Sequence, residues 1–213
     1  MSATETRPAI DDRPRFEEAW ETKRLGELGE LVSSGSYGHE QPTTGLVPRP
    51  VVTTAHISDT DRWKGKSREI RYFRPSDIER LQPVKGDLIV VKSSGSAASV
   101  KSGKMAFVSD DADPFIFTNF LLRFRPIGVN SSWVYYRLTS PEAKRRLPTL
   151  VEASTYPNLR LGDYFDQQID LPPLPEQRAI AAALSDVDDL LAVCAGLADE
   201  DCATYLQAFI SDA

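Results

Sequence analysis

Two clusters of basic side chains are the strongest candidates for chemistry in this sequence, and both suggest phosphate binding. The first, residues 62–74, holds six bases against one acid. Such side chains could neutralise phosphates, and an arginine could read guanine through two hydrogen bonds. The alternative is a solvated pair of strands, because charge alternates with bulk as in an exposed hairpin. The candidate nucleic-acid contacts here are Lys64, Lys66, Arg68 and Arg71.

The second cluster, residues 92–104, combines three lysines with serine, glycine and alanine. Small side chains let the backbone approach a phosphate, which favours a loop beside DNA; a flexible loop without a ligand is the alternative. The spacing does not fit a nucleotide-binding loop, because Met105 stands where magnesium binding needs serine or threonine. The candidate contacts are Lys92, Ser93, Ser94, Lys101 and Lys104, with Arg160 further along the chain.

Glu142 and Lys144 form an acid-x-lysine pair that loosely resembles a nuclease metal site, with Asp111 or Asp113 upstream. Pro141 argues against this interpretation, since proline is favoured at the first position of a helix. A carboxylate in that first turn more simply complements the helix dipole. We therefore expect Glu142 to have a structural role.

Other catalytic and metal-binding sets are missing from the sequence. His39, His56 and the two cysteines lack the spacing of metal ligands. A methyltransferase would need a glycine-rich cofactor turn and an Asn/Asp-Pro-Pro-aromatic tetrapeptide, and neither is present. The acids of Asp186–Asp189 are expected on a solvated helix face. We expect no catalytic residue, metal site or cofactor in this chain.

Short apolar runs and turn residues divide the central part of the chain into strands and helices. Residues 33–50 are rich in Gly, Ser, Thr and Pro, which predicts a loop. Helices are expected to start at Pro75 and, after a serine cap at Ser140, at Pro141. The other expected elements are the strands Val51–His56, Leu88–Val91, Met105–Val108 and Phe115–Phe124 and the helix Trp133–Leu138.

From Pro175 onward the apolar residues follow the three-to-four spacing of an amphipathic helix. Unbroken to Ala213, this helix would be about 57 Å long, too long to bury its stripe on a small domain, so it predicts a partner helix. Gly196 weakens the case for one rod and leaves a helical hairpin open. The expected interface residues are Ile180, Leu184, Val187, Leu191, Cys194 and Leu197. The pattern as a whole predicts an α+β fold: a mixed, β-rich domain, then a long C-terminal amphipathic helix serving as a coiled-coil arm.

The net charge of −6 is unevenly distributed. Residues 173–213 carry a net charge of −7, whereas residues 21–172 carry +3. Phosphate binding needs a local basic surface rather than a basic protein. The composition therefore permits DNA binding by the globular part and gives the arm a strongly acidic character.

The cellular compartment of the protein can be predicted from three features that its sequence lacks. No apolar run is long enough to cross a membrane. The N-terminal residues lack the apolar core of a signal peptide, and two cysteines do not make a disulfide framework. These features predict a cytoplasmic protein.

The segment 171–180, LPPLPEQRAI, is a proline-stiffened stretch that leads directly into the predicted arm. It resembles the "PLPPLPEQ" junction of specificity subunits of type I restriction-modification systems, where a target-recognition domain meets a spacer helix. Other similar segments occur in the family's order. They are Trp20 with 25–28 (LGEL), 86–93 (GDLIVVKS), 118–126 (TNFLLRFRP), 135–138 (YYRL) and 154–159 (STYPNL).

This resemblance implies a non-catalytic subunit that reads double-stranded DNA and docks a DNA adenine methyltransferase subunit, and possibly a restriction subunit. S-adenosylmethionine, ATP and magnesium would be needed only by those partners. The family pattern divides the chain into a polar leader (1–18), a target-recognition domain (19–172) and a spacer and dimerisation helix (173–213).

One departure from the family is the number of domains. The usual member has two recognition domains and two spacer helices, and this chain has one of each. We expect a half-subunit whose arms pair antiparallel in a homodimer that reads a bipartite site; a truncated remnant of a longer protein is the competing explanation. The alternative function is a protein-interaction module that binds no DNA and oligomerises through its arm.

Overall fold

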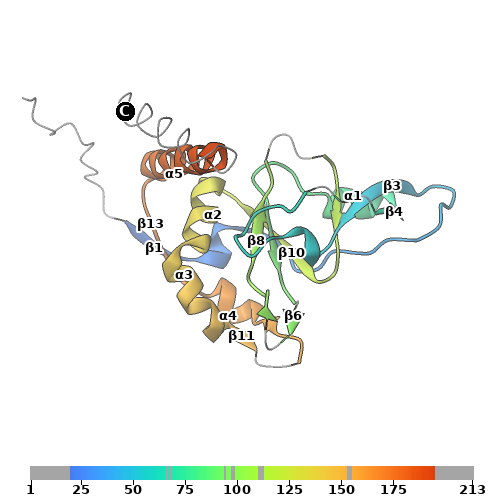
Figure 1. Ribbon diagram of the computed structural model, residues 1–213, viewed down its shortest axis with the longest axis horizontal. Coiled ribbons are helices and arrows are strands. Elements are labelled where there is room, and N and C mark those ends of the chain that lie inside the picture. The colour runs from blue at the N-terminus through green and yellow to red at the C-terminus, as the bar shows by residue number, and fades with distance from the viewer. Residues whose placement is uncertain are drawn as a thin grey trace, which may run out of the picture.

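The structure, a computed structural model, describes residues 20–194 apart from 66, 68, 94, 97–98, 110–112 and 153–154. The expected α+β class is confirmed: several small sheets are packed with helices, and a long helix follows (Figure 1). The predicted leader and the chain beyond Cys194, including Leu197, lie outside the described residues.

The strands are β1 (Glu21–Arg24), β2 (Gly29–Val32), β3 (Val47–Val52), β4 (Ile70–Phe73), β5 (Leu88–Val91), β6 (Gly95–Ser96), β7 (Ser99–Val100), β8 (Met105–Phe107), β9 (Ile116–Phe117), β10 (Leu121–Pro126), β11 (Val151–Glu152), β12 (Asn158–Leu159) and β13 (Gln168–Leu171). The helices are α1 (Pro75–Leu81), α2 (Ser131–Thr139), α3 (Pro141–Arg146), α4 (Leu161–Phe165) and α5 (Leu174–Cys194), with 3-10 turns η1 (Leu25–Leu28), η2 (Thr54–His56) and η3 (Leu147–Leu150).

Strand β5 is the centre of the fold. It lies inside an antiparallel sheet of order β2-β10-β5-β8, and all four of its side chains are buried. Leu88 and Val90 belong to one hydrophobic core, with α2, α4 and α5, whereas Ile89 and Val91 belong to a second core with α1, β3 and β9. A strand covered on both faces has no polar alternation, which explains the unbroken apolar run that predicted it.

A second sheet, of order β4-β3-β9, lies on the α1 side of the central sheet (Figure 1). Its strand β3 corrects two expectations: it begins at Val47, within the predicted loop 33–50, and it ends at Val52, before the 3-10 turn η2. The predicted strand Phe115–Phe124 is two strands in different sheets, because the backbone turns between β9 and β10.

The helix starts follow the capping chemistry expected of them. Helix α1 begins at Pro75, and the Ser140 hydroxyl accepts a hydrogen bond from the Ala143 amide at the start of α3. Helix α2 is capped by the Asn130 side chain, which accepts a hydrogen bond from the Trp133 amide. These caps hold α2 and α3 end to end against the core on the side opposite α1 (Figure 1).

The two ends of the globular part are joined. Strand β1 pairs antiparallel with β13, immediately before α5. The Trp20 indole donates to the Glu176 carboxylate at 3.1 Å. The base of the arm is therefore attached to the first described residues of the chain.

Candidate nucleic-acid interface

Three segments that are distant in sequence meet at one end of the molecule: residues 92–104, the run from α3 to η3, and the hairpin β11–β12. The Ser102 hydroxyl donates to the Pro157 carbonyl at 2.6 Å, and the Leu159 amide donates to the Lys92 carbonyl at 2.8 Å. Figure 1 shows β6, β11 and α4 grouped at this end. We call this surface the basic face, after the cations that its segments carry: Lys92, Lys101, Lys104, Lys144, Arg145, Arg146 and Arg160.

A close backbone approach holds the lysine loop against η3. Gly103 has a φ of +88°, and a Cβ at this position would lie 2.3 Å from Leu147 Cδ1. A side chain at this position would therefore displace the Leu147 side chain or the loop, and glycine also tolerates the positive φ. Gly103 thus lets the lysine loop pack closely against Leu147 of η3.

The last turn of α3 contributes three consecutive bases, Lys144, Arg145 and Arg146. Arg145 and Arg146 are exposed, and within the described part of the chain neither side chain makes a hydrogen bond or ion pair. Lys101 is half-buried, and its side chain likewise makes no hydrogen bond or ion pair within the described part of the chain. These three cations are therefore available to an external anion. Sequence reasoning missed the two arginines, although the signal, three bases at the C-terminal end of a helix, was present.

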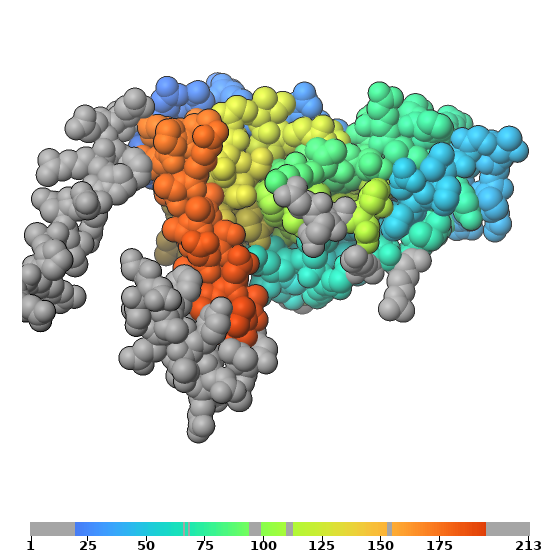
Figure 2. All heavy atoms as spheres, turned by 90° about the horizontal axis from the view of Figure 1, so that it is seen from above, coloured from blue at the N-terminus to red at the C-terminus, as the bar shows by residue number. Residues whose placement is uncertain are grey.

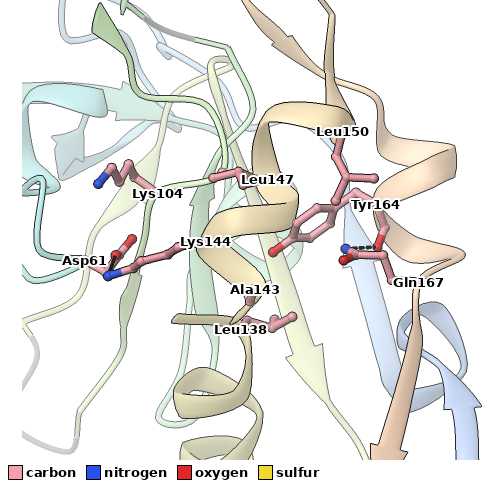
Figure 3. Close-up of a pocket in the computed structure, with 10 residues that line it drawn as sticks. Asp61, Lys104, Leu138, Ala143, Lys144, Leu147, Leu150, Tyr164 and Gln167 are labelled. Atoms are coloured by element: carbon pink, nitrogen blue, oxygen red, sulfur yellow. Dashed lines mark hydrogen bonds and ion pairs between the residues drawn. The ribbon is translucent and has the colours of Figure 1, made fainter. Parts of the chain in front are cut away.

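A small cavity of about 30 Å³ lies under the basic face, lined by Asp61, Lys104, Lys144 and Tyr164 among others (Figure 3). Lys144 Nζ lies 2.9 Å from Asp61 Oδ2, and Lys104 Nζ donates to the Asp59 carbonyl. Ligand sites for small molecules are usually about 300 Å³ or larger. The cavity is therefore too small for a nucleotide or an extruded base.

Other predicted contacts on this face are partly occupied within the protein. Lys92 Nζ donates to the Ser33 carbonyl at 3.1 Å, and Arg160 is 3.1 Å from Asp163. Ser93 is buried and bridges to Asn158, whereas Ser94 lies outside the described residues. Lys101 is therefore the predicted cation of this face whose side chain has no partner within the described residues.

The alternative interpretation of 62–74 as a pair of strands is wrong: among its described residues β4 is the one strand, and its partner is β3. Arg71 pairs with Glu40 at 2.9 Å and Glu69 at 2.7 Å, and these hydrogen bonds raise the pKa of its guanidinium. Lys64 is exposed, while Lys66 and Arg68 lie outside the described residues. Neither Lys64 nor Arg71 makes a described contact with the basic face.

Helix α5 carries the predicted apolar stripe, and most of it is uncovered. Leu184, Val187 and Leu191 are 40%, 46% and 59% exposed, respectively. Ile180 packs partly against the core, and Cys194 is half-buried. The expectation of a wholly solvated acidic face is wrong at Asp188, which pairs with Arg62.

The junction before the arm is held by a buried amide. Gln177 is 2% exposed; its Nε2 donates to the Pro172 carbonyl at 2.7 Å, and its Oε1 accepts from the Asn130 amide at 2.8 Å. Because Asn130 caps α2, this side chain ties the first turn of α5 to the start of α2. The sequence indicated the junction but not this contact.

The geometry does not support the nuclease-like or metal-binding interpretations of the sequence. Glu142 lies in the first turn of α3, as expected, and pairs with Arg137 at 3.1 Å. Among the described residues no group of three or more His, Cys, Asp or Glu side chains could hold a metal ion. No helix in the described part of the chain is long and apolar enough to cross a membrane.

Comparison with solved structures gives two informative likenesses. A chain from work on complex assembly and conformational transition of the type I R-M system has a TM-score of 0.57 and 20% identity, over 95% of this chain and 46% of that one. The type I restriction-modification S subunit from M. genitalium has a TM-score of 0.54 and 17% identity, over 88% of this chain and 43% of that one. The chain thus spans about half the length of these proteins and shares their fold.

No curated protein matches the sequence significantly. A family model does: it describes the type I restriction modification DNA specificity domain, and it matches residues 17–200. That match covers the core, the basic face, the junction and the described arm. The chain belongs to the family of type I restriction modification DNA specificity domains.

Proposed function

We propose that this chain is a non-catalytic DNA-recognition component of a type I restriction-modification system, and that its basic face contacts the DNA backbone. The observation that carries the proposal is that Lys101, Arg145 and Arg146 have no described partner and lie on segments that meet at one end of a member of this family. Lysine and arginine that contact phosphates fix a protein's position on a duplex. Lys92, Lys104, Lys144 and Arg160 surround them and add positive potential.

The rest of the assembly follows from the arm. The exposed apolar stripe on α5 supports pairing with the arm of a second copy, which would cover it. The length of the chain supports the same pairing, since it spans about half of the solved S subunit. Such a homodimer would present two recognition domains, residues 19–172 of each copy, to a bipartite site. A methyltransferase subunit, and a restriction subunit where present, would be directed there and would supply the cofactors and the chemistry.

Salt-dependent binding tests the DNA contact. Fluorescence anisotropy with a labelled duplex of random sequence should detect binding at low salt, and log K should fall linearly with log salt. Arg145→Ala and Arg146→Ala should each weaken binding and reduce the slope by about 0.9 for each phosphate that the variant no longer neutralises. Arg178→Ala is the matched control, since it removes an exposed cation from α5 and should change neither quantity.

The protein-interaction alternative makes the opposite prediction. A chain that binds no duplex at low salt, or whose affinity is equally reduced by Arg178→Ala and Arg145→Ala, would contradict a DNA contact at the basic face. If the chain does bind duplex, selection of bound duplexes by the complex with its methyltransferase partner would identify the recognised sequence.

A further inference from the structure

One short loop, Ser58–Trp63, contacts both the globular core and the arm. The Ser58 hydroxyl accepts hydrogen bonds from the amides of Thr60 and Arg62, and the Ser58 amide donates to the Arg62 carbonyl. Asp61, at the centre of the loop, has a φ of +60°, unusual for a residue other than glycine. The loop is therefore a tight turn closed by its own serine.

On its inner side the loop is fixed to the core. Asp61 is 3% exposed and accepts a hydrogen bond from the Met105 amide at 2.9 Å. The Tyr135 hydroxyl donates to the Asp61 carbonyl at 2.6 Å, and the Trp63 indole donates to the Phe107 carbonyl at 2.7 Å. These bonds join the loop to β8 and α2, so the loop cannot shift without disturbing the central sheet.

On its outer side the same loop holds the arm. Arg62 Nη2 lies 2.5 Å from Asp188 Oδ1, and the Tyr136 hydroxyl donates to Asp188 Oδ2 at 2.7 Å. Figure 2 shows the arm running alongside the segment near residue 60. Burial alone would raise the pKa of Asp188, but the bonds from Arg62 and Tyr136 outweigh it and lower the pKa, so this carboxylate is ionised at neutral pH.

Polar side chains hold the arm in two regions. Glu176 and Gln177 hold its first turn, and Asp188 holds it again eleven residues after Gln177, about 16 Å along the helix. Between them Ile180 and Ala181 pack against the core. Beyond Asp188, no described side chain of α5 makes a hydrogen bond or ion pair with the core. A rod held at one end can pivot, whereas a rod held at two separated points has a fixed direction.

We propose that Asp188 is a positioning residue that, through Arg62 and Tyr136, fixes the direction in which α5 leaves the globular domain. In the homodimer of the proposed function, on which this second step rests, that direction sets the separation of the two DNA-reading domains. Asp188 would therefore influence how far apart the two halves of the recognised DNA site lie, and it would not change the affinity for a single duplex.

Pulsed electron spin resonance on the full chain measures the direction of the arm. One nitroxide is placed on Glu79→Cys in α1 and the other on Val193→Cys at the end of α5, both at exposed positions, with Cys194→Ala and Cys202→Ala. Excess unlabelled chain ensures that only distances within one molecule are recorded. The parent should give one narrow distance population.

Asp188→Ala and Arg62→Ala should lose that narrow population and give a broad distribution of distances, and Tyr136→Phe should give an intermediate width. Asp189→Ala is the matched control, because it removes an exposed aspartate from the next position and should leave the distribution narrow. An unchanged, narrow distribution in a folded Asp188→Ala protein would overturn the proposal. Tyr136→Phe, which removes one hydroxyl, keeps the test valid if the alanine variants do not fold.

Duplex binding by the same variants separates this inference from the proposed function. Asp188→Ala should bind random duplex as the parent does, since no residue of the basic face changes. If the parent binds no duplex, the proposed function fails while the distance result still decides the role of Asp188.

Discussion

At the scale of single residues, Asp87 is a buried carboxylate that holds several charged and polar partners. It is fully buried and accepts two hydrogen bonds from Arg125, at 2.7 and 2.9 Å, and one from the Val84 amide at 2.8 Å. Arg123, 5% exposed, lies 3.9 Å from the same carboxylate. Burial lowers the pKa of Arg123, whereas the bond to Asp87 raises the pKa of Arg125. One buried anion thus compensates two cations, of which Arg123 is buried and Arg125 is partly buried.

Asp87→Ala should therefore lower the free energy of unfolding by about 3–5 kcal/mol, because it leaves the two arginines without their anion. Urea unfolding followed by tryptophan fluorescence measures the change. Asp163→Ala, which breaks an exposed pair with Arg160, should cost less than about 1 kcal/mol. A loss of stability at Asp87 no larger than at Asp163 would contradict this account.

At the scale of elements, the junction between the globular part and α5 depends on one amide. Gln177→Ala removes two hydrogen bonds and leaves the Pro172 carbonyl and the Asn130 amide without their partner, so the free energy of unfolding should fall by about 2–4 kcal/mol. Gln177→Glu should be no better, since a carboxylate cannot donate to Pro172 and would be buried. Gln168→Ala, at an exposed position on β13, serves as the control in chemical denaturation. Equal midpoints for the Gln177 and Gln168 variants would argue against this role.

Elements were predictable from the sequence where local chemistry determines them. Strand β5 was predicted with its observed bounds, because burial on both faces leaves an unbroken apolar run. Ser140 and Pro141 marked the start of α3 for a similar reason, namely that capping is local. Prediction failed where tertiary pairing decides: the turn between β9 and β10 divides one apolar stretch between two sheets, and alternation over 62–74 suggested a hairpin that does not form.

At the scale of the whole molecule, the candidate site was predictable only in part. Lys101 was recognised by the composition of its loop, but that loop meets the segment that carries the arginines of α3 only through tertiary packing, such as Gly103 against Leu147. Arg62 and Asp188 each lay in a charged stretch that the sequence assigned elsewhere, one to DNA and the other to solvent. Charge alone does not tell whether a side chain meets another part of the chain or an external ligand, since both uses require the same residues.

The arm is expected to pair with the arm of a second copy, because its exposed apolar stripe has no partner in the described chain. Sedimentation velocity at micromolar concentration should show a dimer, and Leu184→Asp with Leu191→Asp should convert it to a monomer by placing charge in the paired stripe. Ala182→Asp, an exposed position on the opposite side of α5, should leave the dimer intact. A parent chain that sediments as a monomer, both alone and with its methyltransferase partner, would contradict pairing of the arms. A dimer that survives the Leu184 and Leu191 changes would place the interface away from this stripe, since two buried aspartates at its centre could not be accommodated.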